Sequence, residues 1–356
     1  MSTQRLSGPR FARPEEVVGW FGASQSQDYG PAKWSLGQRS EGSTDAGIER
    51  LFADGTILRT HILRPTWHFV LPADIRWMLE LTGPRVLAQT ASYFRRMDLD
   101  AATLEKSLRT IERALRGGNH LMRKELKTVL EKSGFDLEGN RVSFIMMNAE
   151  LCGLVCSGPR RGKQHTYGLL EERAPNARTL SQEQALAELT VRFFTSHGPA
   201  TLKDFGWWSS LKVADMRKGL EMAGSQLAEQ EIDGVSYWFS GSPSATKVAS
   251  PSVALLQAFD EYVVAYKDSR HVIDAAGTAR AYHEDFPFTG GVVLDSQVVG
   301  TWKSTSAKNE ALIRFALYAH PNEAQTRALH AAASEYAHFL GLPAAVEISL
   351  VPTKAG

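Results

Sequence analysis

Cysteine is scarce in this sequence, because Cys152 and Cys156 are the only two among 356 residues. Two cysteines cannot build a disulfide framework, and such sparse use is typical of proteins from a reducing compartment. Their spacing would place both on one helix face if the segment were helical. Two thiolates supply only half of a zinc site. We therefore expect a structural role for both cysteines and no metal.

Long hydrophobic runs are also missing. No stretch of about 18 apolar residues occurs, so no membrane span is expected. The N-terminal segment 1–13 is polar and lacks the apolar region of a signal peptide. These two absences predict a cytoplasmic protein without a membrane partner.

Neither sign of charge dominates. Lys and Arg number 40 and Asp and Glu number 39, so the formal net charge is +1. A surface for nucleic acid must then be a local concentration of positive charge. The phosphate loop of the Walker type, the His-Glu-x-x-His zinc motif and the Gly-x-Ser-x-Gly elbow are absent too. No nucleotide or metal cofactor is implied.

The first 71 residues follow the order of a winged helix-turn-helix. Pro14 followed by two acidic residues is typical of a helix start, and Gly55 is typical of a helix end. Three helices followed by a two-stranded hairpin form the winged-helix plan. In order, we expect helices over residues 14–22, 32–36 and 43–55, and strands over 56–63 and 66–71.

The same order recurs twice with little sequence identity. The second round has expected helices over 102–115, 120–130 and 144–154, then a wing over 155–170 with a basic tip at 157–163. The third round has expected helices over 180–196 and 211–223, another helix start at 197–205, and a wing strand over 235–239. The chain thus predicts an internal supersecondary repeat.

The composition changes after Ser240, where residues 241–244 read Gly-Ser-Pro-Ser, as in linkers. Beyond it, β-rich runs are expected at 253–256, 262–266, 291–294, 297–303 and 346–351, with one helix over 323–340. The sequence predicts an α+β fold with four units: winged helices over 1–100, 101–178 and 179–240, and a small, mostly β domain with one long helix over 241–356.

Gln25 and Gln27 are the first candidate site residues. Amides are neither strong acids nor strong bases, but they hold water or sugar–phosphate groups by hydrogen bonds. Positions i and i+2 point apart on a helix and share a side in extended backbone. Joint action by the two glutamines therefore requires a non-helical segment, which the Gly, Ser and Pro content around them permits.

Several segments together resemble the AlkZ-like winged-helix DNA glycosylase family. The resemblance covers nearly the whole chain from about Pro14. It is carried by Trp20–Leu36, Arg59–Val70, Asp74–Trp77, Ala258–Tyr262, Gly290–Asp295 and Val299–Trp302. It implies three winged-helix motifs and a barrel-like C-terminal domain. It also implies that Gln25 and Gln27 are catalytic, with Ser26 standing where the family usually has an apolar or small residue.

The resemblance implies hydrolysis of the N-glycosidic bond of alkylated or bulky-adduct purines in duplex DNA. A purine alkylated on a ring nitrogen is cationic and leaves easily, so water positioning by glutamine carbonyls can suffice. Asp28 adjoins the motif and is expected to cap the next helix. The alternatives are a non-catalytic winged-helix regulator and a glycosylase/lyase that uses an amine such as that of Lys33, which we expect on the surface. Three motifs in one chain favour a monomer over a dimer.

Aromatic and basic side chains supply the remaining candidates. His68 and Trp67 are candidates for contact with the damaged nucleotide, and His61 is a weaker one. The predicted phosphate contacts are Arg59, Arg64, Arg160, Arg161 and Lys163. Since no base-edge code is readable, these contacts suit a lesion enzyme better than an operator-reading repressor.

Overall fold

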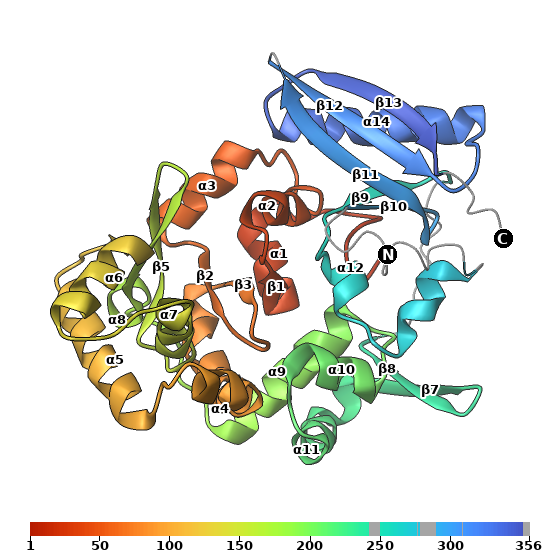
Figure 1. Cartoon of the computed structure of the whole chain (residues 1–356). Helices are drawn as coiled ribbons and strands as arrows, with labels where there is room; N and C mark the ends of the chain where they lie inside the picture. Colours follow the sequence, from red (N-terminus) through yellow and green to blue (C-terminus); the bar gives the residue numbers. More distant parts are fainter. Residues whose placement is uncertain (242–249, 276, 278–289, 308, 352–356) are drawn as a thin grey trace.

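The computed structural model describes residues 1–241, 250–275, 277, 290–307 and 309–351. Helices and antiparallel hairpins alternate in a mixed α/β fold (Figure 1). The N-terminal part of the chain, with α1 and α2, lies between the other groups of elements. The site described below depends on what packs against this central part.

The first group of elements is α1 (Pro14–Phe21), β1 (Ala23–Gln25), α2 (Tyr29–Gly37), α3 (Asp45–Asp54), β2 (Leu58–His61) and β3 (Trp67–Val70). Thr44 caps α3 by accepting a hydrogen bond from the backbone N–H of Gly47 at 3.0 Å. Gly55 ends α3 with φ 89°, a conformation that glycine adopts without strain. The sheet order is β1-β3-β2, so the Gln25 segment is a strand paired with the hairpin.

A long helix, α4 (Pro72–Arg96), lies outside every element expected from the sequence. Pro84 inside it suggests a helix break, yet the helix continues through that position. Gly83 explains the tight packing there, because a Cβ at this position would lie 2.5 Å from the carbonyl oxygen of Leu151. Helix α4 therefore passes close beside the end of α7 (Arg141–Leu151).

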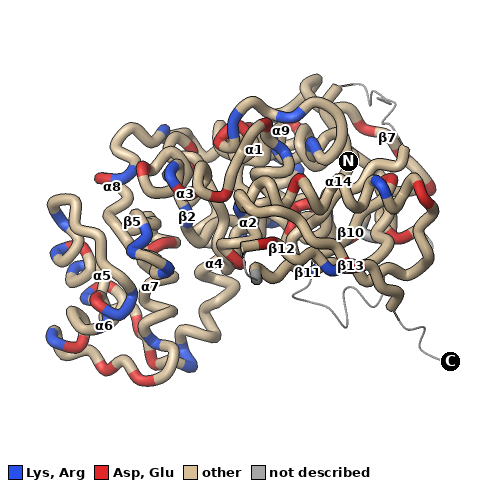
Figure 2. Tube along the Cα trace, turned by 90° about the horizontal axis from the view of Figure 1, so that it is seen from above, with Lys and Arg blue, Asp and Glu red and all other residues tan. Residues whose placement is uncertain are grey.

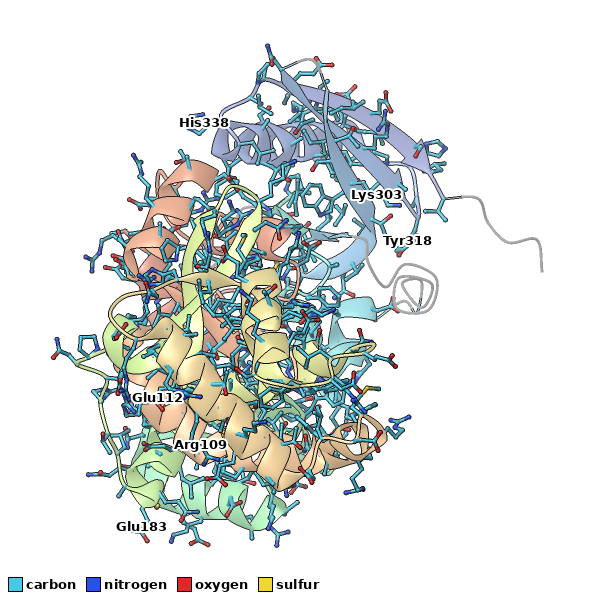
Figure 3. All side chains as sticks on the ribbon, turned by 60° about the vertical axis from the view of Figure 1, so that its left-hand side comes forward. Arg109, Glu112, Glu183, Lys303, Tyr318 and His338 are labelled. Carbon is cyan, nitrogen blue, oxygen red and sulfur yellow. The ribbon has the colours of Figure 1, made fainter. Side chains whose placement is uncertain are left out.

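The second and third groups repeat the order of helices followed by a hairpin. The second comprises α5 (Ala101–Leu115), β4 (Leu121–Met122), α6 (Arg123–Lys132), α7, β5 (Val155–Arg161), β6 (Gln164–Leu169) and α8 (Leu170–Arg173). The third comprises α9 (Gln182–Ser196), α10 (Leu202–Ser209), α11 (Val213–Ala223), β7 (Ala228–Ile232) and β8 (Val235–Phe239). Figure 3 shows Arg109 and Glu112 on α5 at the second group and Glu183 near the start of α9.

The C-terminal region holds β9 (Val253–Leu256), α12 (Glu261–Val264), β10 (Gly290–Leu294), β11 (Gln297–Ala307), β12 (Glu310–Leu317), α14 (Glu323–Phe339) and β13 (Ala344–Leu350). The strands form one sheet in the order β13-β12-β11-β10-β9. Among the described strands β9 and β13 are the two edges, so the sheet is open and the barrel-like expectation is not confirmed. Closure would require those edges to pair.

Two further expectations differ from the structure. The run 262–266 was expected as a strand, but Asp260 accepts from the N–H of Tyr262 at 3.0 Å and starts the short helix α12. Cys152 follows α7 and Cys156 lies in β5, so the two cysteines do not share a helix face. The predicted linker falls mostly on 242–249, outside the described residues.

Four apolar clusters hold these groups together. One joins the first group to α4 and the third group, and a second joins the first group to the C-terminal sheet and α14. A third joins the second group to α4, and a fourth links β9, β10 and α12. The first group thus shares its core with two neighbours. No described helix has the length and apolarity needed to cross a membrane.

Candidate active-site cleft

A cleft of about 370 Å³ opens where the first and second groups meet. Its walls come from the loop after β1, the start of α2, β2 and β3 on one side, and from α6, β5 and β6 on the other. Its lining residues are mostly polar, cationic or aromatic: Gln27, Asp28, Tyr29, Gly30, Lys33, Arg59, Trp67, Arg123, Arg160, His165 and Tyr167. Such a lining suits a polyanion with planar bases.

Gln25 lies at the end of strand β1 and Gln27 lies in the bend that follows it, and the two differ in exposure. Gln27 is exposed and lines the cleft, and its Oε1 accepts from the backbone N–H of Trp67 at 3.2 Å. Gln25 is 4 % exposed, and its Nε2 donates to Thr66 Oγ1 at 3.3 Å. The Oε1 of Gln25 is buried and has no hydrogen-bond partner among the described residues. The buried Gln25 amide thus contacts Thr66, and the next residue along the chain, Trp67, forms the cleft wall.

Arg59 holds the glutamine loop in place. Its guanidinium donates to the carbonyl oxygen of Ser26 at 3.0 and 3.1 Å and to that of Gln27 at 3.4 Å. The same group stacks over the Trp67 ring at 4.6 Å. Burial lowers the pKa of Arg59 to about 10, so it stays charged at neutral pH. Arg59, which the sequence predicts as a phosphate ligand, therefore uses its donors to hold the loop of Gln25 and Gln27.

Trp67 is held from a second side by the second group. Its indole Nε1 donates to Glu150 Oε1 at 3.2 Å, and Glu150 Oε2 lies 2.6 Å from His61 Nδ1. The His61 and Trp67 rings are 4.3 Å apart. Glu150 lies on α7 and is 1 % exposed. The aromatic wall of the cleft therefore depends on the docking of α7.

His68 lies opposite Gln25 in the β1–β3 ladder and is fully buried. Its Nδ1 donates to the carbonyl oxygen of Thr66 at 2.9 Å, so the neutral ring has its lone pair on Nε2. Burial, followed by the nearby charge of Arg64, lowers the pKa of His68 to about 3. The prediction that His68 contacts a damaged nucleotide stays a prediction, and any such contact requires access behind the hairpin.

A buried carboxylate lies behind Gln25. Glu261 Oε1 accepts from the Gln25 backbone N–H at 2.7 Å, and Oε2 accepts from Trp208 Nε1 at 3.1 Å and lies 3.4 Å from His197 Nε2. Burial opposes its charge, but hydrogen bonding and charge from His197 outweigh that effect and lower the pKa of Glu261 to about 2. Sequence reasoning did not find Glu261, because its role depends on contacts more than 50 residues away along the chain.

On the other side of the cleft, three cationic side chains lie close to the ring of Tyr29. Lys33, Arg59 and Arg160 lie 5.2, 5.8 and 4.7 Å from its ring centroid. Glu49 Oε2 accepts from Tyr29, Lys33 and Arg160 at 3.1, 3.0 and 2.9 Å. Lys33 also donates to Asp45 at 2.8 Å and is 4 % exposed, so the surface position expected for it is wrong. A lysine held by two carboxylates is a poor amine nucleophile.

The remaining predicted phosphate contacts lie on the β2–β3 and β5–β6 hairpins. Arg161 forms an exposed ion pair with Glu125. Arg64 is 9 % exposed and donates to the carbonyl oxygen of Val264 at 3.1 Å. Lys163 lines a second, adjoining cleft of about 680 Å³.

That second cleft contains basic residues that sequence reasoning missed. Arg123, Lys124 and Lys127 on α6 line it together with Lys163, and no carboxylate is among its lining residues. It shares Arg123, His165 and Tyr167 with the first cleft, so the two form one continuous cationic surface. Figure 2 shows basic positions in α6 and β5 on the same side of the molecule. The run of three cations within five residues of a helix start was the available signal.

No group of three or more His, Cys, Asp or Glu side chains within the described part of the chain could hold a metal ion. The residues that line the cleft offer the amide of Gln27, the carboxylate of Asp28, aromatic rings and cations.

A mixed α/β fold with an aromatic and cationic cleft defines the class of protein as one that acts on nucleic acid. The chain belongs to the AlkZ-like DNA glycosylase family, whose model matches residues 18–339. It is therefore a DNA glycosylase by family, an enzyme class that hydrolyses N-glycosidic bonds, with DNA as its substrate.

Two comparisons with individual proteins agree with the family. The chain is 24 % identical over 318 residues to the interstrand DNA cross-link repair glycosylase of Streptomyces sahachiroi, covering 85 % of each chain. The solved structure of Streptomyces sahachiroi DNA glycosylase AlkZ matches with a TM-score of 0.80 at 20 % identity, covering 98 % of this chain and 96 % of the other. At that identity the structural match establishes a shared fold.

Proposed function

We propose that this protein is a monofunctional DNA glycosylase that hydrolyses the N-glycosidic bond of alkylated or bulky-adduct purines in duplex DNA. Gln25 and Gln27 position the attacking water. The observation that carries the proposal is the exposed Gln27 amide in a cleft whose lining includes the cations Arg123 and Arg160. An amide that can orient water lies where cations would hold the DNA backbone.

The chemistry needs little acid catalysis when the leaving base is already cationic. The transition state resembles an oxocarbenium ion, so water must be held near the sugar carbon and the developing charge must be tolerated. Gln27 Oε1 already accepts from Trp67, which leaves its NH₂ group to donate into the cleft. Gln25 Oε1 is buried and has no partner among the described residues, so it is the amide oxygen left to accept a hydrogen bond from the water.

The chain would comprise three winged-helix units over 1–100, 101–178 and 179–240, followed by a C-terminal domain over 241–356, and the DNA would lie against the first two units. Support comes from the repeated order of helices and hairpin, and from the cations of the second wing. The third wing differs, because Glu229, Glu231 and Asp233 make it acidic and exposed. We assign phosphate contact to the first two units, in a protein that acts as a monomer.

The name of the Streptomyces sahachiroi relative refers to interstrand cross-links. Cross-linked purines are therefore substrates to test here beside simple N-alkylpurines. Arg160, which lines the first cleft, and Lys163, which lines the second, would hold the backbone that flanks either lesion.

The test is release of modified base from duplex DNA by the purified protein. Replacing both Gln25 and Gln27 by Ala should lower single-turnover release by about 100-fold or more while DNA affinity is kept. The single variants separate a direct role for exposed Gln27 from a role for buried Gln25. Gln230→Ala on the exposed strand β7 is the matched control.

Different outcomes would identify the alternatives. Normal release by the double variant removes the glutamine assignment. A defined palindromic binding site without any abasic product would instead identify a winged-helix regulator. Borohydride trapping of a protein–DNA adduct that is lost in Lys33→Ala would identify a lyase.

A further inference from the structure

The loop that carries Gln27 continues into Asp28, whose carboxylate also lines the cleft. Asp28 occupies the N-cap position of α2, yet its side chain makes no capping hydrogen bond. Pro31, the third residue of the helix, offers no N–H, which removes one of the two usual donors to a capping side chain. A capping side chain usually accepts from the second or third N–H of its helix. The role expected for Asp28 from sequence is therefore not realised by its side chain.

The cations around Asp28 do not neutralise it. Lys33 donates to Asp45 and Glu49, and Arg160 donates to Glu49. Arg59 donates to the carbonyl oxygens of Ser26 and Gln27, and Arg123 donates to Ser143 Oγ. Asp28 forms no ion pair within 4.0 Å with any described residue. A carboxylate thus remains with free oxygens beside the Gln27 amide in a cationic cleft.

We propose that Asp28 is a catalytic residue that accepts the proton of the attacking water, a step that neither glutamine amide can perform. The inference rests on the proposed glycosylase function and adds a general base to it. An amide oxygen does not accept a proton near neutral pH, whereas an ionised carboxylate does.

The step balances without a further reactant. The water oxygen bonds to the sugar C1′, and the bond from C1′ to the purine nitrogen breaks. The electron pair of that bond stays on the purine, which leaves neutral if it was cationic. The water proton passes to Asp28 and then to solvent, and an abasic sugar remains.

The surroundings favour Asp28 as the group whose protonation lowers the rate at acidic pH. Burial raises the pKa of Asp28 above its usual value, and the charge of Arg59 opposes this only in part. Burial and the charge of Arg59 hold the pKa of His165 down at about 4, so that ring is neutral at higher pH. Burial raises the pKa of Tyr167 to about 12, and it also raises that of Tyr29.

The experiment is single-turnover release from duplex DNA that contains one 7-methylguanine, with the full-length protein. We expect Asp28→Asn to lower the rate by about 100-fold or more and to abolish the fall in rate toward low pH. Binding to a duplex with a tetrahydrofuran abasic analogue should be equal or tighter, because a negative charge near phosphate is removed. Asp28→Glu should retain more activity than Asp28→Asn.

Asp100→Asn is the matched control, since Asp100 caps α5 by accepting from the N–H of Thr103 outside the cleft. Thermal melting of each variant separates catalysis from stability. A rate for Asp28→Asn within about threefold of wild type overturns the general base and leaves the glycosylase intact. Rate loss in step with lost affinity or melting temperature also overturns it. If the wild type releases nothing from 7-methylguanine, 3-methyladenine or mustard-cross-linked DNA, the glycosylase proposal itself fails and the base assignment with it.

Discussion

Arg59 shows how burial changes the role of a charged residue. It is 7 % exposed, and its donors are directed to the carbonyl oxygens of Ser26 and Gln27, while its flat face lies on Trp67. A guanidinium serves several acceptors in one plane and stacks on an aromatic ring, whereas an ammonium does neither. The glutamine loop and the aromatic wall are thus coupled through one side chain.

We expect Arg59→Lys to slow base release more than it weakens DNA binding, although the net charge is unchanged. The loop carrying Gln27 loses its bidentate clamp, and stability should fall by about 1–3 kcal/mol because buried acceptors are left unpaired. Single-turnover rates, DNA titrations and urea unfolding measure the three effects. Arg161→Lys, in the exposed pair with Glu125, is the control. If rate and affinity fell equally, Arg59 would be a phosphate ligand rather than a clamp.

At the scale of the element, the contact between α4 and α7 supports the cleft from behind. Gly83 lets α4 approach the carbonyl oxygen of Leu151, the residue that follows Glu150. Glu150 in turn holds Trp67 and His61. A displacement of α7 would therefore be transmitted to the aromatic wall.

We expect Gly83→Ala to destabilise the protein by about 1–3 kcal/mol, since its Cβ would lie 2.5 Å from a backbone oxygen that cannot move freely. Gly30→Ala, in the first turn of α2 with no atom within 4 Å of the added Cβ, should change stability by less than about 0.5 kcal/mol. Urea unfolding midpoints compare the two. Equal stability of both variants would show that the α4–α7 contact is looser than described.

Local signals made most of the repeated helices and hairpins predictable. The cap at Thr44, the glycine at Gly55 and the basic turn of the second wing act within a few residues. Long-range packing explains the failures: α4 continues past Pro84 because it is held against α7, and the β-rich run after Asp260 becomes helix α12 because that side chain caps it.

The candidate site was predictable in part. The glutamine motif is visible in the sequence through its family resemblance, and so is the basic tip at 157–163. The clamp by Arg59, the burial of His68 and the role of Arg123 depend on how the second group docks on the first. Residue type alone could not distinguish a buried arginine from one that faces phosphate.

At the scale of the whole molecule, the charges of 40 basic and 39 acidic residues nearly cancel. Attraction to DNA must therefore come from an uneven distribution of these charges over the surface. The second cleft has Arg123, Lys124, Lys127 and Lys163 in its lining without a carboxylate. The outer side of α5 differs, because Arg109 there is paired with Glu105 and exposed. Lys303 on β11 and His338 on α14, in the C-terminal region, lie well apart from Arg109 and Glu112 on α5 (Figure 3).

DNA affinity should therefore fall with salt in proportion to the phosphates that this cleft contacts. We expect Arg123→Ala and Lys163→Ala each to reduce the slope of log K against log salt concentration by about 1, because each lost contact releases one counterion fewer. Arg109→Ala should leave the slope unchanged. Fluorescence anisotropy with an undamaged duplex over a series of salt concentrations measures this. A change of the same size in Arg109→Ala would place the DNA on the outer face of α5 and away from Gln27.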